Sequence, residues 1–152
     1  MKVWRICKER YAESAFDGEG AKRVGGRWNS RGLRLAYASE NLSLATLELL
    51  VHLELEDSPP EMVAVPALVP GELGVETLEP ADLPTDWRRV DGHPELKARG
   101  NSWLSSQATP LLKVPSAVIP EEYNVLVNPE HPAFEAIDVG LPQPFDFDAR
   151  LF

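Results

Sequence analysis

The chain has 152 residues, of which 43% are hydrophobic and 26% charged, ordinary values for one globular domain spanning residues 1–152. No apolar run approaches the ~20 residues of a membrane helix, and the N-terminus lacks a signal-peptide pattern, so we expect a cytoplasmic protein without membrane contact. The single cysteine, Cys7, cannot form an internal disulfide. A net charge of −9 argues against a nucleic-acid-binding surface.

Charge is distributed unevenly along the chain. Residues 1–34 carry nine lysines and arginines against four acidic residues, whereas the remainder is strongly acidic. A basic stretch within an acidic protein suits a cleft that holds a small anionic ligand, and the acidic exterior suits a basic protein partner.

The first half of the chain predicts two strands, one loop and one helix. The sequence KVWRI predicts a strand over residues 2–6, and the glycines and polar residues of 11–30 predict a long loop. LRLAYA predicts a second strand over 33–38, and SENLSLATLELLVHLEL predicts a helix over 39–55.

All fourteen prolines lie from residue 59 onward, so the second half divides into short elements joined by turns. An acidic, turn-rich segment spans 71–92. The other expected elements are a strand over 62–69 in which Pro66 indicates an edge or a bulge, a helix over 93–107, strands over 111–120 and 121–129, and edge pieces at 137–140 and 149–152. Because strands and helices do not alternate regularly, an α+β fold is favoured over a doubly wound α/β fold.

The helix over 39–55, with Ser39 or Asn41 as its N-cap, contains one carboxylate, Glu48, among residues that avoid water. On a helical wheel apolar residues occupy nearly every side, so we expect the helix to be covered almost all round. A carboxylate in such a place needs an opposite charge or several donors. It is either a functional acid or one half of a structural ion pair.

Arg27 follows two glycines, which permit a tight turn and a close approach of the backbone to a ligand. Its guanidinium can hold a phosphate group through two parallel hydrogen bonds. Tyr37, at the end of a predicted strand, can either stack on a ligand ring or fill the core. Ser116 lies between two prolines without a nucleophile-elbow pattern, and the histidines lack metal-ligand spacing, so no metal site is predicted.

Taken together, these pieces resemble the RES domain, the toxin half of a bacterial toxin–antitoxin pair, which is named for an Arg, a Glu and a Ser. The similarity is carried by WRI, GGRWNSRG, LAYASENLSLATLELLVHL, VPSAVIPEEYNVLVNP and DARLF, in the family's order over nearly the whole chain. On this match Arg27, Glu48 and Ser116 take the three name positions. Tyr37 matches the aromatic residue after the second strand.

The resemblance implies a compact fold like that of the ADP-ribosyltransferases, with a small, mostly antiparallel split sheet, flanking helices and NAD in a central cleft. It implies a toxin that consumes NAD as its substrate, without another cofactor, and that is neutralised by an Xre-like helix-turn-helix antitoxin covering the active site. Members differ in acceptor: some destroy NAD with water or inorganic phosphate, and others transfer ADP-ribose to a protein. A non-catalytic protein-binding module is the alternative from another class.

On this resemblance Glu48 is the predicted catalytic anion, placed beside a ribose that becomes positively charged as nicotinamide leaves. Arg27 is expected to anchor the pyrophosphate and to balance Glu48 electrostatically in the empty site. Tyr37 is expected to stack on the nicotinamide. The further predicted NAD contacts are Trp28, Ser116, which would orient a phosphate or the carboxamide, and Asn124.

Overall fold

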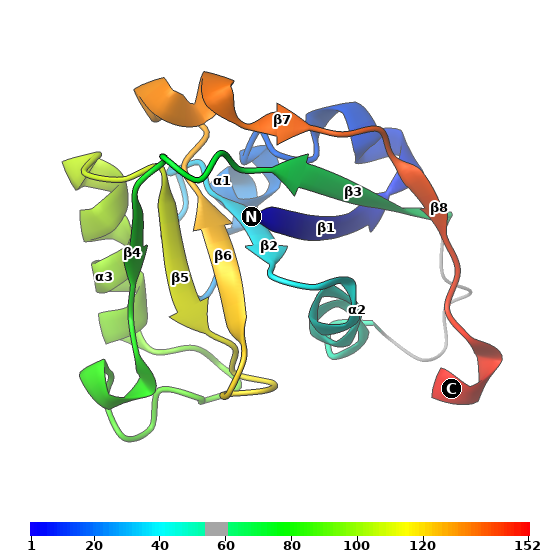
Figure 1. The fold of residues 1–152 in the computed structure, drawn as a ribbon. Coiled ribbons are helices and arrows are strands. Elements are labelled where there is room, and N and C mark those ends of the chain that lie inside the picture. The colour runs from blue at the N-terminus through cyan, green and yellow to red at the C-terminus, as the bar shows by residue number, and fades with distance from the viewer. Residues whose placement is uncertain (54–60) are drawn as a thin grey trace.

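The computed structural model describes residues 1–53 and 61–152, which form one mixed sheet with helices around it (Figure 1). The strands are β1 (Lys2–Lys8), β2 (Ala36–Ser39), β3 (Met62–Leu68), β4 (Val75–Thr77), β5 (Leu111–Pro115), β6 (Tyr123–Val127), β7 (Asp138–Val139) and β8 (Gln143–Phe145). The helices are α1 (Glu19–Val24), α2 (Leu42–Leu50) and α3 (Pro94–Ser106), with 3-10 turns at Glu9–Ser14, Pro80–Asp82, Pro132–Ala136 and Ala149–Leu151. The predicted α+β class is confirmed.

The sheet has the strand order β4-β5-β6-β2-β1-β3-β7, with β8 also paired to β3, and every pair except β4–β5 is antiparallel. Its weakest junction lies in the middle, because β1 and β2 pair only where Trp4 faces Ser39. Just beyond that point the guanidinium of Arg5 donates to the Tyr37 carbonyl at 2.8 Å, in place of a backbone N–H. The sheet is therefore split between β1 and β2, as the resemblance implies.

Both faces of the central strands are buried, which explains their nearly continuous apolar sequences. Side chains alternate along a strand, so β5 and β6 contribute to two separate cores. On one face Val125 and Val127 pack with β1, β3 and Phe16. On the other face Leu126 packs with residues of α3 and with a cluster of tryptophans around Trp103. In Figure 1, α3 flanks β4 and β5, and α2 lies beside β2 and β6.

Strand β3 is an interior strand, so the prediction that Pro66 marks an edge or a bulge is wrong. On one side β3 pairs with β1 along its whole length. On the other side β8 pairs with residues 62–64 and β7 with residues 67–68. Pro66 falls in the gap between these two short strands, where its missing N–H leaves no ladder bond unmade. Its carbonyl accepts a hydrogen bond from the Gly140 N–H instead.

The other predicted elements are confirmed with shifted ends, and four segments differ. The segment 71–92, expected to be rich in turns, also contains the short strand β4. Residues 11–30, predicted as a loop, contain most of one 3-10 turn and the whole of α1. The sequence does not reveal these helices because six residues are too few to show apolar periodicity. The tail 149–152 holds a 3-10 turn rather than a strand, and β8 precedes it. The helix predicted over 39–55 spans Leu42–Leu50 and is capped by Asn41, whereas residues 54–55 lie outside the described part of the chain.

Candidate active site

Glu48 lies at the centre of a polar network formed with Ser116, Asn124 and Ser39, here called the Glu48 network. Its Oε1 accepts one hydrogen bond from the Ser116 hydroxyl and one from the side-chain amide of Asn124, each at 2.7 Å. Its Oε2 forms no hydrogen bond with any described residue. One carboxylate oxygen is thus fixed by the protein, and the other is free to accept a hydrogen bond from a ligand.

Ser116 is fully buried, and its hydroxyl is used entirely within the protein. Besides donating to Glu48, its oxygen accepts the backbone N–H groups of Val118 and Ile119 at 3.1 and 3.0 Å. A hydroxyl has one donor and two acceptor positions, and all three are occupied. This geometry corrects the prediction that Ser116 contacts NAD directly: the serine positions Glu48, and the turn after β5 positions the serine.

Asn124 reaches Glu48 because strand register brings it there. Ser39 faces Asn124 across the β2–β6 pair, and the Ser39 hydroxyl donates to the Asn124 Oδ1 at 2.7 Å. That bond directs the amide nitrogen of Asn124 toward Glu48. Tyr37 lies two residues before Ser39, on the same face of β2. The alternation of a single strand therefore gathers the polar residues on one surface.

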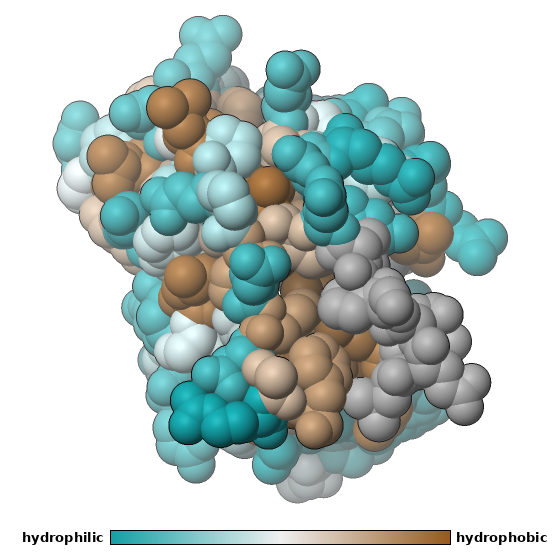
Figure 2. All heavy atoms as spheres, turned by 90° about the vertical axis from the view of Figure 1, so that its right-hand side faces the viewer, coloured by the Kyte–Doolittle hydropathy of each residue, from teal (hydrophilic) through white to brown (hydrophobic). Residues whose placement is uncertain are grey.

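Helix α2 is only partly covered, which corrects the expectation that it is buried nearly all round. Its fully buried residues are Leu44 and Ala45, while Leu47 is 37% exposed and Val51, just past its end, is 58% exposed. Figure 2, which views the molecule from the α2 side, shows apolar side chains gathered on this face. Glu48 itself is half-buried, so its free oxygen is within reach of a ligand while its neighbours reduce screening by water.

Arg27 is held by a loop that is distant in sequence. Its Nη1 donates to the backbone carbonyls of Trp87 and Arg89, at 3.2 and 3.0 Å. Among the described residues, Glu48 forms no ion pair within 4.0 Å, so the expected electrostatic balance between Glu48 and Arg27 is not a direct contact. Because carbonyls carry no net charge, Arg27 keeps its full charge available for an anion.

Tyr37 is tied to the Arg27 turn through its hydroxyl. The hydroxyl accepts the Trp28 N–H at 3.0 Å and donates to the Asn29 Oδ1 at 2.7 Å. Burial raises the pKa of the Tyr37 hydroxyl, so it remains a neutral donor. A Cβ at Gly26 would stand 2.5 Å from this oxygen, which explains why the turn requires glycine there. The half-buried ring is available for the stacking contact that the sequence predicts.

Trp28 has a buried side chain, in contrast to the prediction that it contacts the substrate. Its side chain is 2% exposed and packs in the core on the α3 side of the sheet. Its carbonyl oxygen lies so near Gly100 that an added Cβ there would approach within 1.7 Å. Trp28 therefore fixes the Arg27 turn against α3, and its ring is sealed from any ligand.

Several residues that build the site escaped the sequence analysis. Asn29 is fully buried and donates to the carbonyls of residues 21, 30 and 33, which locks the Arg27 turn. Arg5 spans the sheet split, with its Nε buried and unpaired, and burial lowers its pKa. Ser39 was considered only as a helix cap. Asn and Ser residues in the sequence only weakly indicate a site, because which polar residues face each other across two strands is known only once the strand register is known.

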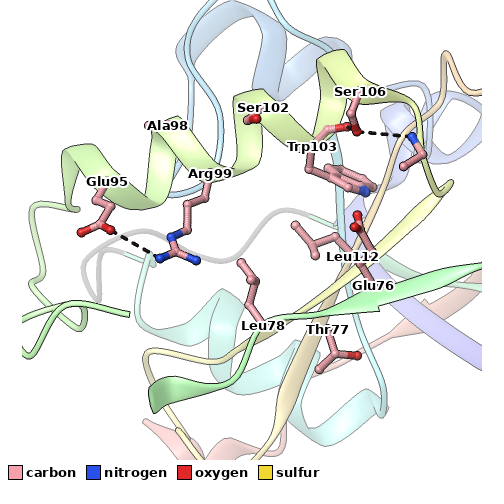
Figure 3. Close-up of a pocket in the computed structure, with 11 residues that line it drawn as sticks. Glu76, Thr77, Leu78, Glu95, Ala98, Arg99, Ser102, Trp103, Ser106 and Leu112 are labelled. Atoms are coloured by element: carbon pink, nitrogen blue, oxygen red, sulfur yellow. Dashed lines mark hydrogen bonds and ion pairs between the residues drawn. The ribbon is translucent and has the colours of Figure 1, made fainter. Parts of the chain in front are cut away.

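Two cavities lie outside the Glu48 network. One, of about 650 Å³, opens between α3 and β4 and is lined by Glu76, Arg99 and Trp103 among others (Figure 3). In Figure 3 Arg99 and Glu95 pair along the helix, and with Glu76 the lining carries one more negative than positive charge. The other, of about 400 Å³, is bordered by residues 8–10 and Glu61. Neither is lined by Glu48, Arg27 or Tyr37.

Residues 1–53 and 61–152 contain no group of three or more His, Cys, Asp or Glu side chains arranged to hold a metal ion. Within the same ranges, no helix has the length and apolarity required to cross a bilayer.

Comparison with known proteins places the chain in a family. The RES domain family matches residues 2–148. The chain belongs to the RES domain family. A curated relative named Toxin Res, from Yersinia enterocolitica serotype O:8 / biotype 1B (strain NCTC 13174 / 8081), is 36% identical, with 99% of each chain covered.

A second relative of this RES domain, named Prs ADP-ribosylating toxin, comes from Sphingobium sp. (strain YBL2). It is 37% identical over 97% of this chain and 94% of the relative. Among solved structures, the M. tuberculosis MbcT–MbcA toxin–antitoxin complex contains a similar chain, with a TM-score of 0.79 and 18% identity over 95% of this chain and 83% of that one. The structural likeness supports the compact α+β fold class expected from the sequence.

Proposed function

We propose that this RES domain is a toxin that cleaves NAD at the bond between nicotinamide and ribose, with water or inorganic phosphate as acceptor. The observation that carries the proposal is the state of Glu48: one oxygen is fixed by Ser116 and Asn124, and the other has no partner among the described residues. The toxin names of its relatives support the toxin role.

The chemistry follows from the charge that develops during bond cleavage. Nicotinamide leaves with the electron pair of the glycosidic bond, and the ribose C1′ becomes an oxocarbenium-like cation that the acceptor oxygen attacks. The free Oε2 of Glu48, accepting from the ribose 2′-hydroxyl, would stabilise this positive charge. A preorganised charge or donor of this kind contributes about 3–4 kcal/mol to lowering the barrier. Two donors on the other oxygen hold the carboxylate in place, so little reorganisation accompanies the reaction.

Arg27 would hold the pyrophosphate, since only its Nη1 has a hydrogen-bond partner among the described residues. Tyr37, anchored to the same turn, would stack on the nicotinamide and keep it at a fixed distance from that anchor. Ser116, Asn124 and Ser39 would act through Glu48.

The partner is proposed to be an antitoxin of the Xre-like helix-turn-helix class that covers this site. The structural neighbour comes from a toxin–antitoxin complex, which supports an antitoxin partner. The exposed apolar residues Leu47 and Val51 near Glu48 offer the partner a surface beside the site.

A second candidate function is transfer of ADP-ribose to a protein side chain at the same site. It is favoured by the name of the Sphingobium relative, an ADP-ribosylating toxin. The third alternative, a non-catalytic module with Glu48 and Arg27 as a structural ion pair, loses its basis because these residues form no ion pair in the structure.

The test is proton and phosphorus NMR of the products that the purified chain forms from NAD. Free nicotinamide with ADP-ribose, or with a phosphorylated ADP-ribose when phosphate is added, is the expected result. Labelled NAD is then incubated with the chain and a cell extract: label that moves to a protein band would favour the transferase. No nicotinamide release under any of these conditions would overturn both enzymatic proposals.

A further inference from the structure

Two adjacent arginines in the segment before α3 have different surroundings. Arg89 is neutralised: its Nε and Nη2 contact Asp91 at 3.2 and 3.0 Å, and its Nη1 lies 3.7 Å from Asp86. Arg88 is exposed and forms no ion pair with any described acidic residue. Its Nε donates to the Ala117 carbonyl at 2.9 Å, which fixes the guanidinium while leaving both terminal nitrogens without a described partner.

The contacts of Arg88 place it between the two halves of the candidate site. The carbonyls that hold Arg27 belong to Trp87 and Arg89, the residues on either side of Arg88. The carbonyl that holds Arg88 belongs to Ala117, which follows the serine bonded to Glu48. The Arg88 guanidinium thus bridges the Arg27 anchor and the Glu48 network.

We propose that Arg88 and Arg27 together form an anion subsite for a phosphoryl group beside Glu48. The proposal rests on the proposed function only in assigning that phosphoryl group to a substrate. A chain with net charge −9 does not attract anions through its overall field, so binding must come from local cations. In this region Arg27, Arg88 and Arg89 carry three positive charges against two negative charges on Asp86 and Asp91, and both acids pair with Arg89 rather than with Arg27 or Arg88. A net positive charge of one therefore remains, and the two arginines that carry it without an ion pair to a described residue are Arg27 and Arg88.

The geometry also suits the ligand. Each of these guanidinium groups is held on backbone carbonyls through one nitrogen and keeps other N–H groups without a described partner, as binding of phosphate through paired hydrogen bonds requires. The phosphoryl group has two possible sources, the diphosphate of the dinucleotide and an inorganic phosphate acceptor, and a direct binding experiment distinguishes them.

Isothermal titration calorimetry of the full chain with ADP-ribose, and separately with inorganic phosphate, tests the subsite without any turnover. We expect Arg88→Gln to weaken binding of at least one probe by about tenfold, and Arg88→Lys, which keeps charge but loses the planar fork, to weaken it less. Arg99→Gln removes the same charge from the cavity between α3 and β4, which neither Arg27 nor Arg88 lines, and should alter neither affinity more than about twofold. Thermal unfolding of each variant checks that the fold is retained.

Loss of ADP-ribose affinity alone assigns the subsite to the diphosphate, and loss of phosphate affinity alone assigns it to the acceptor. No measurable binding of either probe by the wild-type chain, or unchanged binding by Arg88→Gln, would overturn the subsite. Because the readout is binding, absence of NAD cleavage would count against the proposed function without affecting this result.

Discussion

Replacing Glu48 with glutamine separates the charge of this residue from its hydrogen bonds. The amide oxygen of the introduced glutamine can still accept from Ser116 and Asn124, so the two contacts at 2.7 Å survive and the free energy of unfolding should change by less than about 1 kcal/mol. What is lost is the negative charge opposite the developing cation. A loss of about 3 kcal/mol of transition-state stabilisation corresponds to a roughly 150-fold fall in the rate of nicotinamide release.

The assay is the initial rate of nicotinamide release at saturating NAD, followed by proton NMR. The control is Glu40→Gln, which removes an equal charge just before α2, from a carboxylate that pairs with Lys113 instead of the Glu48 network. That control should release nicotinamide at nearly the wild-type rate and lose no more than about 1 kcal/mol of stability. If folded Glu48→Gln released nicotinamide at a rate within a factor of about three of wild type, the electrostatic role of Glu48 would be refuted.

Three further outcomes follow from the packing. Gly100→Ala would place a methyl group 1.7 Å from the Trp28 oxygen, so thermal melting should show a loss above about 3 kcal/mol, and an unchanged melting temperature would contradict the close approach. Ser39→Ala removes the donor that orients the Asn124 amide, so the turnover number should fall by about three- to tenfold while the melting temperature stays unchanged. A large fall in the melting temperature would instead indicate a general packing defect. Burial raises the pKa of the Cys7 thiol, so less of it is present as the reactive thiolate at any given pH. A thiol reagent at a pH of about 8 should therefore label Cys7 only as fast as the chain unfolds. Rapid labelling of the native chain would contradict the burial of Cys7.

The elements that the sequence predicts well are those with an unambiguous local pattern. Apolar runs bounded by prolines identify β5 and β6, and an N-cap followed by apolar residues identifies α2. Their partners are less predictable, because register and strand order depend on contacts between distant segments. The misplacement of Pro66 shows this directly: an interior proline is acceptable only because two short strands leave a gap beside it, and no pattern in β3 reveals that gap.

The candidate site divides in the same way. Ser116 and Asn124 lie 68 and 76 residues beyond Glu48 along the chain, so their assembly could be anticipated only from the resemblance and not from spacing. The resemblance predicts which residues form the site, but it does not predict which of them are buried. Ser116 and Trp28 are fully enclosed, and burial is a property of the surrounding chain rather than of the residue itself.

The anchoring of Arg27 explains why its supporting segment carried no recognisable motif. The contacts come from the backbone carbonyls of residues 87 and 89, which almost any side chain could supply, so the segment can change in sequence while still holding the guanidinium. A carboxylate in their place would hold Arg27 more strongly, but it would also cancel the charge that an anionic ligand needs. Neutral anchors keep the arginine fixed and charged at once. The residue between these two carbonyls is Arg88. A substitution of its side chain would change the affinity of this RES domain for phosphoryl groups without removing a contact of Arg27 or Glu48.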